Sequence, residues 1–322
     1  MKKLLAYLLC VLFIFQMTSC YRYDFYDDYV SYLQNLMTTE TVEGTAIPYF
    51  VATEAILEKG KPLSPYYIYD GNYDSDASPL RPSYRQGICR NLKGKPVVVL
   101  LFADDEESLW TKEEIISFTN DGVMPALGFL KREAERWGVE LDFQVESYSS
   151  ALTGYNLSYA GVMPTKSKEA IKVKIMEHMA GDLGFNSAWN LYSYMQSQYP
   201  TQEIIFLTIL NKDGRSYASQ LVDVGYNRHV EHCVLYAKSS SAGKYLPQMV
   251  AHEILHLFGA EDLYAENATQ EIEDITKKEF PNDIMWTYLD HWENQVEAFT
   301  AYAIGWTSEI PEVCNLEEWK FD

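Results

Sequence analysis

The sequence predicts an α/β (α+β) domain over residues 95–322, preceded by a smaller N-terminal part. Apolar strand-like runs and amphipathic helix-like segments alternate along this region, an order typical of a sheet covered by helices. The chain has 322 residues, 47% of them hydrophobic and 14% aromatic, so it can bury a large core and is not mainly disordered. No internal repeat interrupts the pattern.

Two patterns identify the strands. Residues 96–103 (PVVVLLFA) are a continuous apolar run, typical of a strand buried on both faces, whereas residues 139–146 alternate polar and apolar side chains. Residues 203–210 and 230–237 are two further apolar runs, and we expect strands there as well.

Helices are expected where apolar residues recur at helical spacing. Asp121-Gly122 would interrupt the first of these helices. The predicted helices cover residues 112–137, 166–183, 245–258 and 292–304.

The charge of the chain excludes several classes of partner. Its formal net charge is −20, from 26 Lys and Arg against 46 Asp and Glu. A body this acidic repels phosphate backbones and anionic head groups. We therefore expect no nucleic-acid partner and no electrostatic docking on a membrane, and we expect a monomer.

Residues 1–19 have the features of a secretion signal. Lys2 and Lys3 precede an apolar run that is too short to span a bilayer comfortably. Residues 17–20 (MTSC) resemble the lipobox of bacterial lipoproteins, in which cleavage leaves a lipid-bearing cysteine at the new N-terminus. The resemblance implies an exported lipoprotein anchored through Cys20 in the outer membrane, facing the periplasm or the outside. Residues 20–94 would then be a tether or extension of unknown role.

Three cysteines remain in the exported body: Cys89, Cys233 and Cys314. An odd number allows at most one disulfide among them. Cys233 lies in an apolar run and is expected to be a buried hydrophobe. Cys89 and Cys314 are therefore the pair that could form a bridge.

Residues 252–262 (HEILHLFGAED) contain the residues that we expect to form a zinc site. His252 and His256 are four residues apart in a predicted helix, so their imidazoles lie on one face and can share a zinc ion. Glu253 lies next to the first histidine, where it could deprotonate a metal-bound water. Gly259 would end the helix in a sharp turn, and Asp262 could then return to the metal as a third ligand. Glu261 competes with Asp262 for this role.

The whole segment resembles the metzincin zinc motif HExxHxxGxxH, with Asp262 in place of the last histidine. Residues 282–285 (NDIM) resemble the Met-turn that follows this motif, with Met285 beneath the zinc ligands, and residues 297–306 resemble the C-terminal helix. The resemblance implies a mixed twisted sheet with backing helices, an active-site helix, a Met-turn and a C-terminal helix. Tyr288, one residue later than the tyrosine of several metzincin groups, is a secondary candidate for zinc ligation or oxyanion stabilisation.

These features predict a zinc-dependent endopeptidase that acts on a protein or peptide substrate, with Glu253 as general base and one catalytic zinc ion. The resemblance further implies that substrate lies extended along an edge strand of the sheet. Two alternatives stay open: a catalytically silent, zinc-bearing surface lipoprotein that binds a protein or glycan, and a zinc amidase acting on cell-wall peptide. Acidic residues at alternate positions over 70–76 suggest a calcium loop, but they lack the glycine and closing glutamate of such loops, so a solvated acidic loop is favoured.

Overall fold

The computed structural model describes residues 88–106, 108–159, 168–199, 203–219, 230–238, 240–264, 268–290 and 293–314. The predicted secretion signal, Cys20, the predicted tether up to residue 87 and the acidic residues at 70–76 lie outside the described residues. In the part of the chain that is described, no helix has the length and apolar character needed to cross a membrane.

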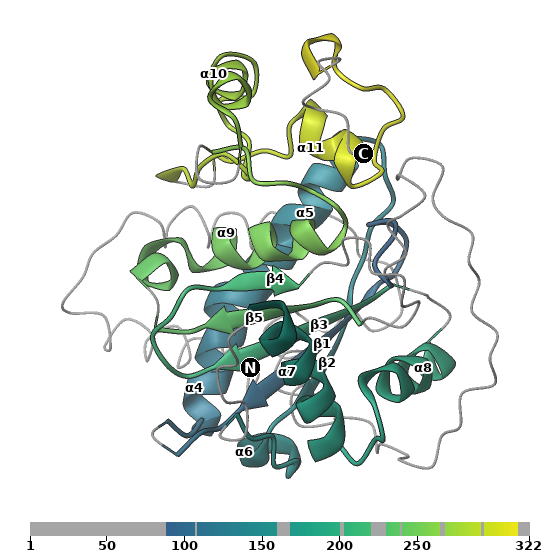
Figure 1. Ribbon diagram of the computed structural model, residues 1–322, viewed down its shortest axis with the longest axis vertical. Helices are drawn as coiled ribbons and strands as arrows, with labels where there is room; N and C mark the ends of the chain where they lie inside the picture. The colour runs from purple at the N-terminus through teal and green to yellow at the C-terminus, as the bar shows by residue number, and fades with distance from the viewer. Residues whose placement is uncertain are drawn as a thin grey trace, which may run out of the picture. The chain divides into compact units, whose positions relative to one another are not determined.

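A mixed five-stranded sheet is the centre of the described region, in the order β2-β1-β3-β5-β4 (Figure 1). The first four strands of this order are parallel, and β4 pairs antiparallel with β5 at the edge. The strands are β1 (Val97–Ala103), β2 (Gln144–Tyr148), β3 (Ile204–Leu210), β4 (Tyr217–Ser219) and β5 (His232–Tyr236).

The central position of β1 and β3 follows from their composition. Every residue of both strands is buried, which requires cover on both faces of the sheet. Helices provide this cover: Figure 1 shows α5 behind the sheet and α7 in front of it. The helices are α4 (Lys112–Phe118), α5 (Met124–Arg136), α6 (Ser150–Thr153), α7 (Lys168–Asp182), α8 (Ala188–Gln198), α9 (Ser240–Leu257), α10 (Gln270–Glu279) and α11 (Ala298–Ala303).

The helix predicted over residues 112–137 is one continuous rod with a change of winding in the middle. It begins at a capping box, in which the Thr111 side chain and Glu114 satisfy each other's backbone N–H groups. The interruption expected at Asp121-Gly122 is a π-helical segment, η1 (Thr119–Val123), between α4 and α5. The segment η1 packs against α9, the helix that carries the HExxH motif.

Several predicted boundaries are wrong, and some elements were not predicted. The strand expected from residue 139 begins at Gln144, because the residues before it make only an isolated bridge between Gly94 and Leu141. The helix expected over 292–304 is shorter and begins only at Ala298, the start of α11. Before it, the backbone of Gln295 hydrogen-bonds to that of Asn282 and Ile284. The missed elements are β4, which has three residues, and the helices α6, α8 and α10.

Residues 88–94 pack with the domain that was expected to begin at residue 95. Ile88, Cys89 and Leu92 are buried in the same core as the sheet. The backbone N–H groups of Cys89 and Arg90 donate to the carboxylates of the buried Glu231 and the partly buried Glu203, at 2.8 and 2.6 Å. This segment is therefore part of the packed domain.

The disulfide considered for Cys89 and Cys314 does not form. Cys89, Cys233 and Cys314 are all buried, and none is in a disulfide. The Cys89 thiol instead donates to the Ile204 carbonyl oxygen at 3.5 Å, and the Cys233 thiol to the Glu253 carbonyl oxygen at 3.2 Å. The thiols thus act as small core side chains.

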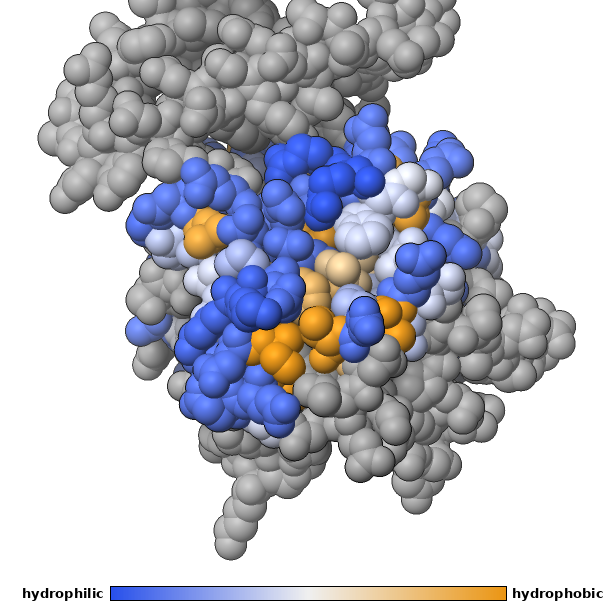
Figure 2. Space-filling model, turned by 90° about the horizontal axis from the view of Figure 1, so that it is seen from above, coloured by the Kyte–Doolittle hydropathy of each residue, from blue (hydrophilic) through white to orange (hydrophobic). Residues whose placement is uncertain are grey.

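The surface seen from above in Figure 2 is mainly hydrophilic, with hydrophobic residues grouped near the middle of the described region. Large hydrophobic side chains that are exposed are few in the part of the chain described, namely Leu109 and Val313.

Two glycines allow the packing of η1 on α9 to be tested. A Cβ at Gly122 would lie 2.7 Å from Leu246 Cγ, whereas a Cβ at Gly181 in α7 would meet no atom within 4 Å. We predict that Gly122→Ala lowers the free energy of unfolding by about 1–3 kcal/mol through overpacking. Gly181→Ala should instead raise it by roughly 0.5–1 kcal/mol, because alanine favours the helix. Urea unfolding of both variants measures this, and equal effects would contradict the packing argument.

Candidate metal centre

The helix α9 presents the HExxH residues after a kink. Tyr245 has non-helical angles (φ −121°, ψ 33°), and the regular helix follows it. Pro247 is therefore in the first turn, where a missing N–H costs little. The residues that flank the motif, among them Val250, Ala251, Ile254 and Leu255, are completely buried. The packing of this apolar face fixes the rotation of the helix about its axis, and thus the direction in which His252 and His256 project.

The end of α9 returns the chain toward these histidines. Gly259 has a φ of 103°, and its N–H donates to the His256 carbonyl oxygen at 3.0 Å. The Ala260 N–H donates to the Leu255 carbonyl oxygen at 3.2 Å. These two bonds form a Schellman motif, which ends a helix and reverses the chain direction at a residue with positive φ. Asp262 follows three residues after Gly259 and lies next to the two imidazoles.

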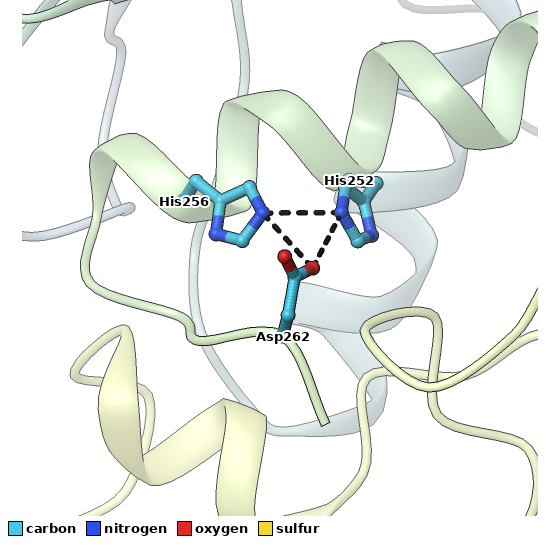
Figure 3. A group of neighbouring side chains, drawn as sticks. All are labelled: His252, His256 and Asp262. Atoms are coloured by element: carbon cyan, nitrogen blue, oxygen red, sulfur yellow. Dashed lines mark hydrogen bonds and ion pairs between the residues drawn. The ribbon is translucent and has the colours of Figure 1, made fainter. Parts of the chain in front are cut away.

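Three ligand atoms converge at this point (Figure 3). His252 Nε2 lies 3.0 Å and His256 Nε2 3.3 Å from Asp262 Oδ1, and the two Nε2 atoms are 3.1 Å apart. The histidines come from the helix and the aspartate from the loop after it. Among the described residues, one group of side chains could hold a metal ion: His252, His256 and Asp262. Glu261 is not part of this group.

The outer ring nitrogens show that the geometry suits a metal. His252 Nδ1 lies 3.1 Å from the Ile284 carbonyl oxygen, and His256 Nδ1 lies 2.8 Å from the Ala260 carbonyl oxygen. A carbonyl only accepts, so each Nδ1 carries a proton and donates it. In the neutral tautomer each Nε2 then directs its lone pair toward the other and toward Asp262. This is the hydrogen-bond pattern that orients histidine ligands of zinc, and the donor set of two imidazoles and a carboxylate fits that ion.

Opposite charges stabilise this group of side chains. Burial by itself would lower the pKa of His256, but Asp262 and Glu253 outweigh it and raise this pKa to about 9. Burial would likewise raise the pKa of Asp262, but hydrogen bonds from His252 and His256 hold it well below its usual range. A positive charge is thus stabilised among these side chains, at the place where a metal cation would bind.

Glu253 has a different environment from Asp262. Its exposed fraction is 6%, and it lies on the wall of the same cleft as His252. Burial raises its pKa, and the positive charge on the two imidazoles opposes this shift only in part. A carboxylate with a raised pKa accepts a proton readily, which is the property a general base needs.

The turn predicted at Met285 is tied to both ends of the motif. The Ile284 carbonyl oxygen accepts from His252, and the Met285 carbonyl oxygen accepts from the Leu263 N–H at 3.0 Å. Met285 itself is fully buried. The turn therefore fixes the first histidine and the loop that carries Asp262.

Asp283 organises this turn and was not singled out from the sequence. One carboxylate oxygen accepts from the Met285 N–H at 2.7 Å, and the other accepts from the Glu297 N–H at 3.1 Å. The first of these is an Asx-turn, so an aspartate two residues before Met285 was the available signal. Asp283 is fully buried, and burial raises its pKa to about 7 despite these bonds.

A cleft of about 460 Å³ gives access to the group. Tyr288, a secondary candidate from the sequence, is on its wall, and its ring centroid lies 5.6 Å from that of His252. Sequence analysis missed Arg215, Tyr264 and Trp286, which line the same cleft from separate loops. The lining residues are Gly214, Arg215, Ser216, Met249, His252, Glu253, Tyr264, Ile284, Trp286, Thr287 and Tyr288.

Mutation can test which of the two carboxylates at the end of the motif, Glu261 or Asp262, is the metal ligand. We predict that Asp262→Ala weakens zinc binding. Loss of a residue that only hydrogen-bonds to a zinc ligand lowers metal affinity roughly 10- to 100-fold, so loss of a ligand itself should cost at least that much. Glu261→Ala should leave zinc affinity within about twofold, because Glu261 is outside the group. Competition with a chromophoric chelator measures both affinities. The reverse order would mean that Glu261 is the ligand.

The raised pKa of Asp283 predicts a pH dependence of stability. The folded protein keeps this proton up to its pKa of about 7, whereas an unfolded aspartate releases it near the ordinary aspartate pKa of 3.8. The proton therefore stabilises the fold at low pH, and this contribution is lost as pH rises through 7. In excess chelator, the free energy of unfolding of the wild type should fall between pH 5 and 8 relative to that of Asp283→Asn, by up to a few kcal/mol. A constant difference between the two proteins would contradict a raised pKa.

Comparison with known protein families, with curated proteins and with solved structures found no match for this chain. Its candidate function therefore rests on the geometry of the metal centre and the cleft.

Proposed function

We propose that this chain is a zinc-dependent endopeptidase of metzincin type, with His252, His256 and Asp262 as zinc ligands and Glu253 as general base. One observation carries the proposal. Two histidine rings, each oriented by a hydrogen bond from Nδ1 to a backbone carbonyl, bring their Nε2 atoms within about 3 Å of each other and of a carboxylate oxygen. The buried Glu253 lies on the wall of the same cleft.

The arrangement around the site supports the metzincin type. The antiparallel strand β4 is at the edge of the sheet and contacts α9, and the turn at Met285 hydrogen-bonds to both ends of the motif. An edge strand offers unpaired backbone groups, so an extended peptide could add to it beside the cleft. Residues 214–216, which line the cleft, lead directly into β4.

Zinc, when bound, would supply a Lewis acid that acidifies a water molecule and polarises the scissile carbonyl. Glu253 takes the proton of the attacking water and delivers it to the leaving amine nitrogen. Tyr288 lies next to His252, where its hydroxyl could donate to the oxygen of the carbonyl under attack.

The decisive experiment compares the wild type with Glu253→Gln on a peptide library. Glutamine has nearly the same shape but cannot accept the proton, so turnover should fall by at least the roughly 10²- to 10⁴-fold that general-base catalysis contributes. Zinc content should stay at one ion per chain, because Glu253 is not a ligand. Glu261→Gln is the matched control, because it makes the same change at a neighbouring carboxylate outside the metal group, and it should retain activity. Equal turnover of wild type and Glu253→Gln would overturn the proposal.

Two other functions would use the same residues. A silent surface lipoprotein would bind zinc, but it would cleave no substrate, and Glu253→Gln would change nothing that can be measured. A cell-wall amidase would release peptide from isolated peptidoglycan and spare the protein library. The position of Glu253, buried on the cleft wall next to His252, favours an enzyme over the silent lipoprotein, because binding alone does not require a carboxylate there.

The proposal extends to location. The resemblance of residues 17–20 to a lipobox supports an exported lipoprotein, with Cys20 as the lipid anchor and the residues between Cys20 and the packed domain, which includes residues 88–94, as the connection.

A further inference from the structure

A positively charged side chain, Arg215, lies on the wall of the cleft beside the candidate metal ligands. Among the described residues that line the cleft it is the only lysine or arginine, in a chain whose net charge is −20. The side chain is exposed, so it can meet a ligand that enters the cleft. A cationic group in this position is not needed to hold zinc, which requires acceptors, and it has no part in the proton transfers of Glu253.

The backbone on both sides of Arg215 is held in place. A Cβ at Gly214 would lie 2.3 Å from Tyr236 Cδ1, so the chain can pass the Tyr236 ring this closely only as glycine. Ser216 is buried, and its hydroxyl accepts from the Tyr236 N–H at 3.0 Å and donates to Met249 Sδ at 3.1 Å. Arg215 is thus presented to the cleft from a fixed position between two anchored residues.

Arg215 also interacts with groups of the candidate active site. Its side chain hydrogen-bonds to the Tyr264 hydroxyl, which in turn interacts with Asp262. Its charge also acts on Glu253 and Tyr288. The guanidinium therefore lies close to the place where the reacting bond would be.

We propose that Arg215 determines specificity by binding a carboxylate next to the scissile bond. The inference rests on the proposed function, because it names the substrate class of that same site. A guanidinium pairs with a carboxylate through two parallel hydrogen bonds. Because residue 215 is two residues before β4, a peptide added to that edge strand passes directly by it. The carboxylate could come from an Asp or Glu side chain or from the free C-terminus of the substrate.

The test measures binding, so it does not depend on turnover. Zinc-loaded protein carrying Glu253→Gln is titrated with pools of degenerate heptapeptides in which one position is fixed as Glu or as Gln. Each pool is made with a free and with an amidated C-terminus. Because Trp286 lines the cleft, tryptophan fluorescence can report the binding.

We expect the Glu pool to bind at least tenfold more tightly than the Gln pool for at least one fixed position. Adding Arg215→Gln should abolish this preference, whereas Arg215→Lys should keep part of it, because lysine retains the charge but not the paired hydrogen bonds. If the C-terminus is the source of the carboxylate instead, the Glu and Gln pools should bind equally, and amidation should weaken the binding of both. Lys278→Gln, on the exposed surface of α10, removes the same charge outside the cleft and should leave the preference intact.

Three results would overturn the inference: no difference between the Glu and Gln pools together with no difference between the free and amidated pools, a preference that survives Arg215→Gln, or no binding of any pool. If Arg215 serves only to position Tyr264, its loss should weaken the Glu and Gln pools by the same factor. Cleavage of the same pools by the wild type separates this inference from the proposed function. Selective binding without cleavage would refute the endopeptidase alone, and cleavage without preference would refute the role of Arg215 alone.

Discussion

The hydrogen bonds from two histidine Nδ1 atoms to backbone carbonyls set the geometry on which the candidate site depends. They turn the Nε2 atoms of His252 and His256 inward, against the Asp262 carboxylate. The acceptor for His256 is Ala260, in the turn that ends its own helix, and the acceptor for His252 is Ile284, more than thirty residues away. One ring is therefore oriented by local structure and the other by tertiary structure. Loss of either acceptor would leave a ring that can rotate.

The long-range acceptor requires a precise turn, and the buried Asp283 provides it. Its two carboxylate oxygens bind N–H groups at Met285 and Glu297, so it joins the turn to the segment before α11. A fully buried acid with a pKa near 7 is costly to ionise. The protein tolerates this cost because the same group satisfies two backbone donors that would otherwise be buried without acceptors. The site thus depends on a residue that touches none of the three candidate ligands.

Two carboxylates at the candidate site, Glu253 and Asp262, have pKa values shifted in opposite directions. Glu253 is buried and gains a proton easily, whereas Asp262 is paired with imidazoles and stays ionised. This separation of two nearby carboxylates is the pattern expected where one is a base and the other a ligand. Arg215 adds a positive charge to the wall of the same cleft, and this charge opposes the rise in the pKa of Glu253.

The sequence by itself determined the parts of this protein that depend on neighbours along the chain. The i, i+4 spacing places His252 and His256 on one face of any helix, Gly259 permits the turn that follows, and the apolar runs of β1 and β3 are typical of strands buried on both faces. The tertiary structure decided the rest. It decided that β4, a three-residue strand with no pattern of its own, pairs at the edge, and that Cys89 and Cys314 stay reduced. It also brought Arg215, Tyr264 and Asp283 to the site, because their roles arise from contacts between loops that are distant in sequence, and no local periodicity records such contacts.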